Sequence, residues 1–151
     1  MAFFQQVKLK IKTLPHFFGD LPQYQTPGSS GFDVRAQIRE PITLKPLERA
    51  IVPTGLSFEI PPGYEIQSRP RSGLAAKQGL SILNTPGTID SDYRGEVKII
   101  LVNLSSEPIT IQDQDRCAQL ILAPVVQAQF ELATDFTATE RGAGGFGSTG
   151  V

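Results

Sequence analysis

Arginine, serine and glycine residues in one short segment offer the first possible chemistry in this chain. The segment Arg69-Pro70-Arg71-Ser72-Gly73 places two guanidinium groups, a hydroxyl and backbone N–H groups at the expected start of a helix. The N-terminal end of a helix carries partial positive charge, and arginine binds phosphate through paired hydrogen bonds. The segment therefore predicts an anion site, although an ordinary helix cap with solvated arginines would use the same residues.

Three other segments carry side chains that could take part in catalysis. The stretch 84–95 combines turn-forming residues with a tyrosine and the carboxylates of Asp90 and Asp92. The stretch 115–119 brings polar side chains to the start of an apolar run, and 141–150 spaces an arginine, a phenylalanine and two hydroxyls with glycines. Each also has an ordinary interpretation, as a turn, an outward-facing residue or a disordered end.

The composition narrows the chemistry further. The 151 residues include 14 Lys or Arg and 15 Asp or Glu, so no general basic field for nucleic acid is expected. His16, the only histidine, is expected at the surface or half-packed, which disfavours a zinc site or a Ser-His-Asp triad, and the single Cys117 excludes an internal disulfide. Apolar runs are too short for a membrane span, and the N-terminal residues lack signal-peptide character. We expect a cytoplasmic protein whose catalysis uses carboxylates, arginines, hydroxyls or an oxygen-ligated metal.

Short strands must position these segments. Apolar residues alternate with polar ones in the stretches 7–12, 32–38, 56–60, 109–111 and 126–130, and 97–104 is more continuously apolar. Twelve prolines and 14 glycines separate the stretches. One helix of about two turns is expected, from Ser72 as its N-cap to Gly79 just after its end. The pattern predicts an all-β, jelly-roll-like sandwich or barrel as one domain over residues 1–140, followed by a mobile glycine-rich tail over 141–151.

Taken together, these segments resemble one family. The stretches 28–36, 69–79, 84–95, 115–120 and the tail match, in order, the five motifs of the homotrimeric deoxyuridine triphosphatases. Ser30 stands where the family usually has alanine and Cys117 where it has isoleucine or valine, and neither departure affects the expected activity. The resemblance implies Mg²⁺-assisted hydrolysis of dUTP to dUMP and pyrophosphate, by in-line attack of water on the α-phosphorus. Such an activity keeps uracil out of DNA and supplies dUMP for thymidylate synthesis.

The resemblance also implies roles for individual residues. Asp90 would deprotonate the attacking water, Gln119 would help to hold that water, and Asp33 would reach the Mg²⁺ through further water molecules. The substrate would be bound by four groups of residues: Arg71, Ser72 and Gly73 on the phosphates; Asn84, Gly87, Thr88, Ile89 and Lys98 of a hairpin on the uracil; Tyr93 on the deoxyribose; and Arg141, Phe146, Gly147, Ser148 and Thr149 of the tail on the γ-phosphate and base.

The family resemblance implies partners and exposes rival functions. We expect a homotrimer that binds dUTP in active sites shared between subunits, with neither nucleic acid nor a membrane as a partner. A dCTP deaminase shares the fold, but such enzymes carry Asp-Pro-Gly in the third motif and lack the glycine-rich fifth motif. A regulatory module without catalysis would have lost Asp90 or Arg141, and this sequence retains both. The motifs therefore favour the triphosphatase over both rivals.

Overall fold

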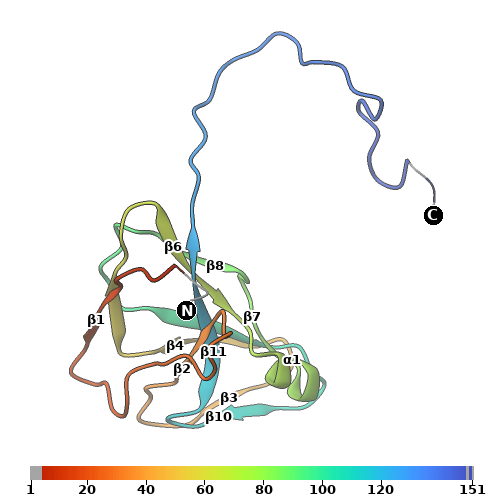
Figure 1. The fold of residues 1–151 in the computed structure, drawn as a ribbon. Helices are drawn as coiled ribbons and strands as arrows, with labels where there is room; N and C mark the ends of the chain where they lie inside the picture. Colours follow the sequence, from red (N-terminus) through yellow and green to blue (C-terminus); the bar gives the residue numbers. More distant parts are fainter. Residues whose placement is uncertain (1–4, 149, 151) are drawn as a thin grey trace.

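The computed structural model describes residues 5–148 and 150, which form eleven strands and one short helix (Figure 1). The elements, in chain order, are β1 (Lys10–Thr13), β2 (Phe32–Arg35), β3 (Ile42–Leu44), β4 (Arg49–Pro53), β5 (Leu56–Glu59), β6 (Tyr64–Arg69), α1 (Ser72–Gln78), β7 (Leu80–Ile82), β8 (Gly87–Ile89), β9 (Lys98–Asn103), β10 (Ile109–Ile111) and β11 (Arg116–Pro124). Among these residues, no helix is long and apolar enough to cross a membrane.

Antiparallel pairing organises the strands into a jelly-roll-like β fold, as the sequence predicts. The larger sheet has the strand order β2-β11-β6-β8, and a smaller sheet has the order β4-β9-β7. Two further pairs, β1 with β5 and β10 with β3, complete the body. The long strand β11 pairs with β2 on one side and β6 on the other, and it runs through the middle of the body before the chain leaves (Figure 1).

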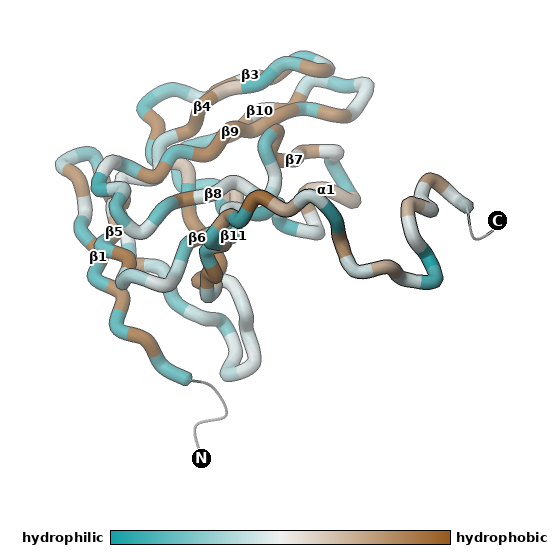
Figure 2. The backbone as a smooth tube through the Cα atoms, turned by 90° about the horizontal axis from the view of Figure 1, so that it is seen from above, coloured by the Kyte–Doolittle hydropathy of each residue, from teal (hydrophilic) through white to brown (hydrophobic). Residues whose placement is uncertain are grey.

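The core lies between the sheets and is built by the alternation seen in the sequence. Val34, Ile66 and Leu120 of the larger sheet are at most 1% exposed, as are Val52 and Leu101 of the smaller sheet. Successive side chains of a strand point to opposite faces, so alternate apolar residues can fill one interior. Figure 2 shows hydrophobic stretches along the strands and hydrophilic ones at many of the connections between them.

The predicted helix is present as α1, but its first residue differs in role from the prediction. Arg71, not Ser72, is the N-cap, with φ −84° and ψ 127°, and no side chain caps the helix there. Ser72 is already helical, so its hydroxyl does not occupy the capping position. The other end agrees with the sequence, because Gly79 adopts φ 70° and its N–H bonds back to Ala75.

The predicted strand at 126–130 is wrong for the isolated chain. After β11 ends at Pro124, residues 125–140, here called the arm, run away from the body with no strand assigned (Figure 1). Val126 and Phe130 are each 96% exposed. A strand needs a neighbouring edge to satisfy its backbone groups, and the arm reaches none among residues 5–148 and 150. The apolar alternation is present in the sequence, but no strand among the described residues pairs with this segment.

Candidate active site

The strand register brings three of the predicted polar segments together. On β11, Gln119 lies opposite Asp33 of β2 on one side and opposite Arg69 of β6 on the other. The Arg71 guanidinium donates from Nε to Asp33 Oδ1 at 3.0 Å. Gln119 donates from Nε2 to the Pro70 carbonyl at 2.9 Å. The first, second and fourth motifs therefore meet on one surface, although they lie far apart in the sequence.

This cluster is half-buried and has more positive than negative charge. The Asp33 side chain is 20% exposed and the Arg71 side chain 27%, and Arg116 Nη1 lies 3.5 Å from Asp33 Oδ2. Two guanidinium groups thus face one carboxylate, next to the N-terminus of α1. A Cβ on Gly31 would lie 2.7 Å from Gln119 Oε1, so glycine is what leaves room for that amide. The arrangement can accept an anion, because both arginines retain N–H donors beyond those used by Asp33.

A cavity of about 330 Å³ lies beside the turn that joins β8 to β9. The turn is held by a hydrogen bond from the Tyr93 N–H to the Asp90 carbonyl at 3.1 Å. The strand β8 ends at this turn, and the buried Val97 anchors the chain where β9 begins. The cavity combines carboxylates, a phenol, a lysine and backbone groups, and it is lined by Thr88, Ile89, Asp90, Tyr93, Glu96, Val97 and Lys98.

The base of the β8–β9 hairpin depends on a close approach of two strands. Gly87 pairs with Ser68 of β6, and a Cβ at Gly87 would overlap the Ser68 hydroxyl. The same Cβ would lie 3.3 Å from Asn84 Nδ2, so Asn84 reaches the same corner. Because β8 is at the edge of its sheet, it pairs with β6 on one side only in the described chain. The backbone groups on its other edge are left for solvent or a ligand.

The tail residues lie apart from both groups. Arg141 donates from Nε to the Gly144 carbonyl at 2.8 Å, and Phe146 and Ser148 are exposed, as is Gly147. Figure 1 shows the tail at a distance from the body, at the end of the arm. Thr149, the last of the predicted tail residues, lies outside the described residues.

Within one chain the predicted residues therefore fall into three groups. A second cavity, of about 200 Å³, is lined in part by Arg71, Asp115 and Arg116, and it shares no residue with the cavity beside Asp90. Neither lining includes a tail residue. Sequence reasoning missed Glu96 in the cavity beside Asp90, because the matched motif ends at Gly95. The only available signal was its position between that motif and the buried start of β9.

The titratable groups define what chemistry the site can use. Cys117 is 3% exposed, and this burial raises the pKa of its thiol to about 12, so it remains protonated and unreactive at neutral pH. Across residues 5–148 and 150, no three His, Cys, Asp or Glu side chains gather into a metal-binding group. Carboxylates, arginines and hydroxyls, which the composition favours, therefore stay the candidate functional side chains.

Comparison with known proteins gives a consistent result. Residues 19–150 match the family model described as dUTPase. The chain is 70% identical over 146 residues to a deoxyuridine 5'-triphosphate nucleotidohydrolase of Bdellovibrio bacteriovorus, covering 97% of this chain and 98% of the relative. A protein of the same name from Fusobacterium nucleatum is 55% identical over 143 residues, covering 95% and 98%. A solved dUTPase of Staphylococcus bacteriophage 80alpha with dUPNHPP superposes with a TM-score of 0.85 at 26% identity, covering 97% of this chain and all of that one.

Proposed function

The chain belongs to the dUTPase family, and we propose that it hydrolyses dUTP to dUMP and pyrophosphate with its own residues in the roles described below. The observation that carries the proposal is the cavity beside Asp90. It gathers Thr88, Ile89, Tyr93 and Lys98 around that carboxylate, and the family resemblance assigns all five to substrate binding or catalysis. A cytoplasmic location suits the single buried thiol and is part of the proposal.

The hairpin selects the uracil base and the deoxyribose. The free edge of β8 offers backbone N–H and C=O groups at fixed positions, which suit the alternating donors and acceptors of uracil. Cytosine would present a donor where the site also donates, and such a buried mismatch is heavily penalised. Thymine is refused because its methyl group has no room. The ring of Tyr93 lies flat on the deoxyribose and leaves no space for a ribose 2′-hydroxyl.

Asp90 acts as the general base. Its exposed carboxylate at the rim of the cavity can take a proton from a water that attacks the α-phosphorus in line, while Gln119 holds this water. Arg71, Ser72 and Gly73 bind the phosphate chain, supported by the surplus positive charge around Asp33. The same donors stabilise the negative charge that develops on the leaving pyrophosphate.

Magnesium fits this donor set as an ion carried by the substrate. The described residues form no cage of metal ligands, whereas Asp33 offers carboxylate oxygens in the cluster that would meet the phosphates. Mg²⁺ keeps several waters and commonly binds through phosphates and one or two carboxylates. When bound, it would neutralise charge on the triphosphate, and Asp33 would hold it through water.

A homotrimer with shared sites explains why one chain keeps its functional groups apart. The cavity beside Asp90, the Arg71 cluster and the tail lie in separate places, and the arm carries exposed apolar residues outward. Phe130, Leu132 and Phe136 are each more than 90% exposed, which is unusual for large apolar side chains so close together in the sequence. An arm that packs on a neighbouring subunit would bury them and deliver the tail to that neighbour's site.

Pyrophosphate release tests the function directly. The purified protein should hydrolyse dUTP far faster than dCTP, dTTP or UTP, and removal of Mg²⁺ with a chelator should abolish the activity. Asp90→Asn keeps the shape of the side chain but removes the base, so kcat should fall by about three orders of magnitude or more with little change in dUTP binding. Ammonia release from dCTP would identify a deaminase instead. Retention of more than about a tenth of kcat by Asp90→Asn would assign the base elsewhere, with Asp92 the next candidate.

A further inference from the structure

Glu96 is the one charged residue in the lining of the cavity beside Asp90 to which the family resemblance gives no role. It lies in the β8–β9 turn, between the exposed tip of that turn and the buried Val97. Its side chain is only 12% exposed although it carries a carboxylate. A nearly buried carboxylate must have hydrogen-bond partners to offset its desolvation, and these partners show what it does.

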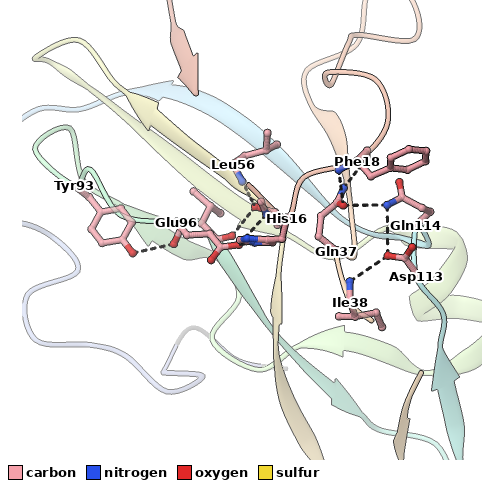
Figure 3. Close-up of polar contacts among 12 residues, drawn as sticks. His16, Phe18, Gln37, Ile38, Leu56, Tyr93, Glu96, Asp113 and Gln114 are labelled. Carbon is pink, nitrogen blue, oxygen red and sulfur yellow. Dashed lines mark hydrogen bonds and ion pairs between the residues drawn. The ribbon is translucent and has the colours of Figure 1, made fainter. Parts of the chain in front are cut away.

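Two partners from outside the hairpin hold the Glu96 carboxylate, and Figure 3 shows the contact with His16. His16 lies with Nε2 2.6 Å from Glu96 Oε1, and the Gly55 N–H donates to the same oxygen at 2.9 Å. His16 belongs to the loop after β1, and Gly55 to the turn between β4 and β5. Because a carboxylate can only accept, the proton in the His16 contact sits on Nε2 of the imidazole. Glu96 therefore joins three segments that are far apart in the sequence.

The partners are themselves fixed by the body of the protein. The Leu14 N–H donates to the Gly55 carbonyl at 2.8 Å. Gly55 has φ +68°, and a Cβ there would lie 3.0 Å from the Cβ and 3.1 Å from the Cα of Phe17, so the loop and the turn are in close contact. The fully buried Thr54 donates from Oγ1 to the Val97 carbonyl at 2.5 Å, directly after Glu96. The Glu96 carboxylate thus rests on a rigid support.

Glu96 also contacts Tyr93, through its backbone carbonyl. The Tyr93 hydroxyl donates to the Glu96 backbone carbonyl at 2.9 Å, a bond also drawn in Figure 3. A Cβ on Gly95 would overlap that hydroxyl, so the ring folds closely over the turn. Tyr93 is 46% exposed, and its hydroxyl makes no other hydrogen bond to the described residues. The position of its ring therefore depends on the position of the Glu96 carbonyl.

We propose that Glu96, held by His16 and Gly55, is a positioning residue that fixes the Tyr93 ring against the sugar of the substrate. The idea rests on the proposed function, because it deepens the sugar selection assigned there to Tyr93. Glu96 does not touch the reacting atoms in this role. It sets the wall that excludes the ribose 2′-hydroxyl, so its loss alters substrate choice and KM more than the chemical step.

Two substitutions of Glu96 and one control substitution at Glu59 test the idea. Glu96→Ala should lower the ratio of kcat/KM for dUTP over UTP by about tenfold, mainly through KM, because the ring gains freedom. Glu96→Gln keeps an acceptor oxygen and should stay within about threefold of the unchanged protein. Glu59→Ala removes a carboxylate of an exposed pair with Lys10 and is the matched control, with no effect on the ratio.

A spectroscopic readout follows the ring without relying on activity. The chain has three tyrosines and no tryptophan, so 3-fluorotyrosine labelling gives few fluorine signals, and Tyr93→Phe identifies that of Tyr93. This signal should shift or broaden in Glu96→Ala but not in Glu96→Gln or Glu59→Ala. If the unchanged protein does not cleave dUTP, the proposed function fails, while the fluorine signal still reports whether Glu96 positions the ring.

Three results would overturn the proposal. One is a folded Glu96→Ala protein with unchanged selectivity and an unchanged Tyr93 signal. Another is an equal loss of kcat toward dUTP and UTP with no change in KM, which would indicate general damage to the fold. If Glu96→Ala does not fold, His16→Ala replaces it, because the His16 side chain is 39% exposed and the Gly55 bond remains. An unchanged ratio and fluorine signal in His16→Ala would then exclude the positioning role.

Discussion

Two inactive variants of this chain should restore each other's activity when they share a trimer. One variant is Asp90→Asn, which retains the tail, and the other is a chain ended after Glu140, which retains Asp90. A site that takes the hairpin from one subunit and the tail from another can then be complete in both parts. The direction of the arm, away from its own body, is the structural reason to expect such exchange (Figure 1).

The length of the arm allows the exchange. About 16 residues separate Val125 from Arg141, and a fully extended chain of that length spans roughly 55 Å. A body of this size has a radius of gyration of about 14 Å, so the arm can pass across a neighbouring subunit. With equal amounts of the two variants and random assembly, about one quarter of the sites would combine an intact hairpin with an intact tail from different chains.

The assay is pyrophosphate release from dUTP after the variants are unfolded and refolded together. Native mass spectrometry confirms that mixed trimers have formed, and each variant refolded alone supplies the background. Removing the tail should leave the melting temperature nearly unchanged, because most of its described residues are exposed and none of them belongs to the hydrophobic core. Activity of the mixture should approach about a quarter of the unmodified enzyme.

A second mixture distinguishes whether the tail at each site comes from the chain that supplies Asp90 or from another chain. Unmodified chains are combined in equal amounts with chains that carry both Asp90→Asn and the truncation. Sites built from different chains would retain about one quarter of full activity, whereas sites built from one chain would retain about one half. The reasoning is refuted if mixed trimers form, the first mixture shows no activity above its background, and the second retains half. A chain that is monomeric by mass spectrometry would refute the shared site itself.

Three further predictions concern sugar selection, core stability and the buried thiol. Tyr93→Ala should lower the ratio of kcat/KM for dUTP over UTP even if activity toward dUTP also falls, and an unchanged ratio would assign sugar selection to another group. Asn103→Ala should lower the free energy of unfolding in urea by about 2–4 kcal/mol, because the fully buried amide bonds the Leu44 and Glu107 carbonyls and accepts from Ser105; a loss below about 1 kcal/mol would contradict this. Burial raises the pKa of the Cys117 thiol from 9.0 to about 12. Between these two pH values the folded protein keeps the thiol proton, whereas the unfolded chain loses it. Stability from this group should therefore be constant below pH 9 and fall by up to about 1.4 kcal/mol per pH unit as the pH rises from 9 toward 12, and Cys117→Ala should lack that component in urea titrations.

Some features of this protein are set by short stretches of its sequence. The alternation at 56–60 and 109–111 and the apolar run at 97–104 correspond to β5, β10 and β9 in the structure. The helix at 72–78 also follows from local signals, because Gly79 tolerates the positive φ that ends it. These features depend on residues within a few positions of each other. The motif residues could likewise be picked out, because their order and spacing resemble the five motifs of a known family.

Contacts between residues far apart in the chain determine the features that local sequence patterns do not predict. Arg71 and Asp33 are 38 residues apart and His16 and Glu96 are 80 apart, so no local pattern could pair them. The sequence places His16 only at the surface or half-packed, and the folded chain shows its contact with Glu96 of the hairpin. At residues 126–130 the local pattern is typical of a strand, yet no strand forms there. The pattern specifies a face to bury but not the partner that buries it. Strand pairing depends on where distant segments come to lie, and a strand makes its backbone hydrogen bonds only where an unpaired edge is within reach.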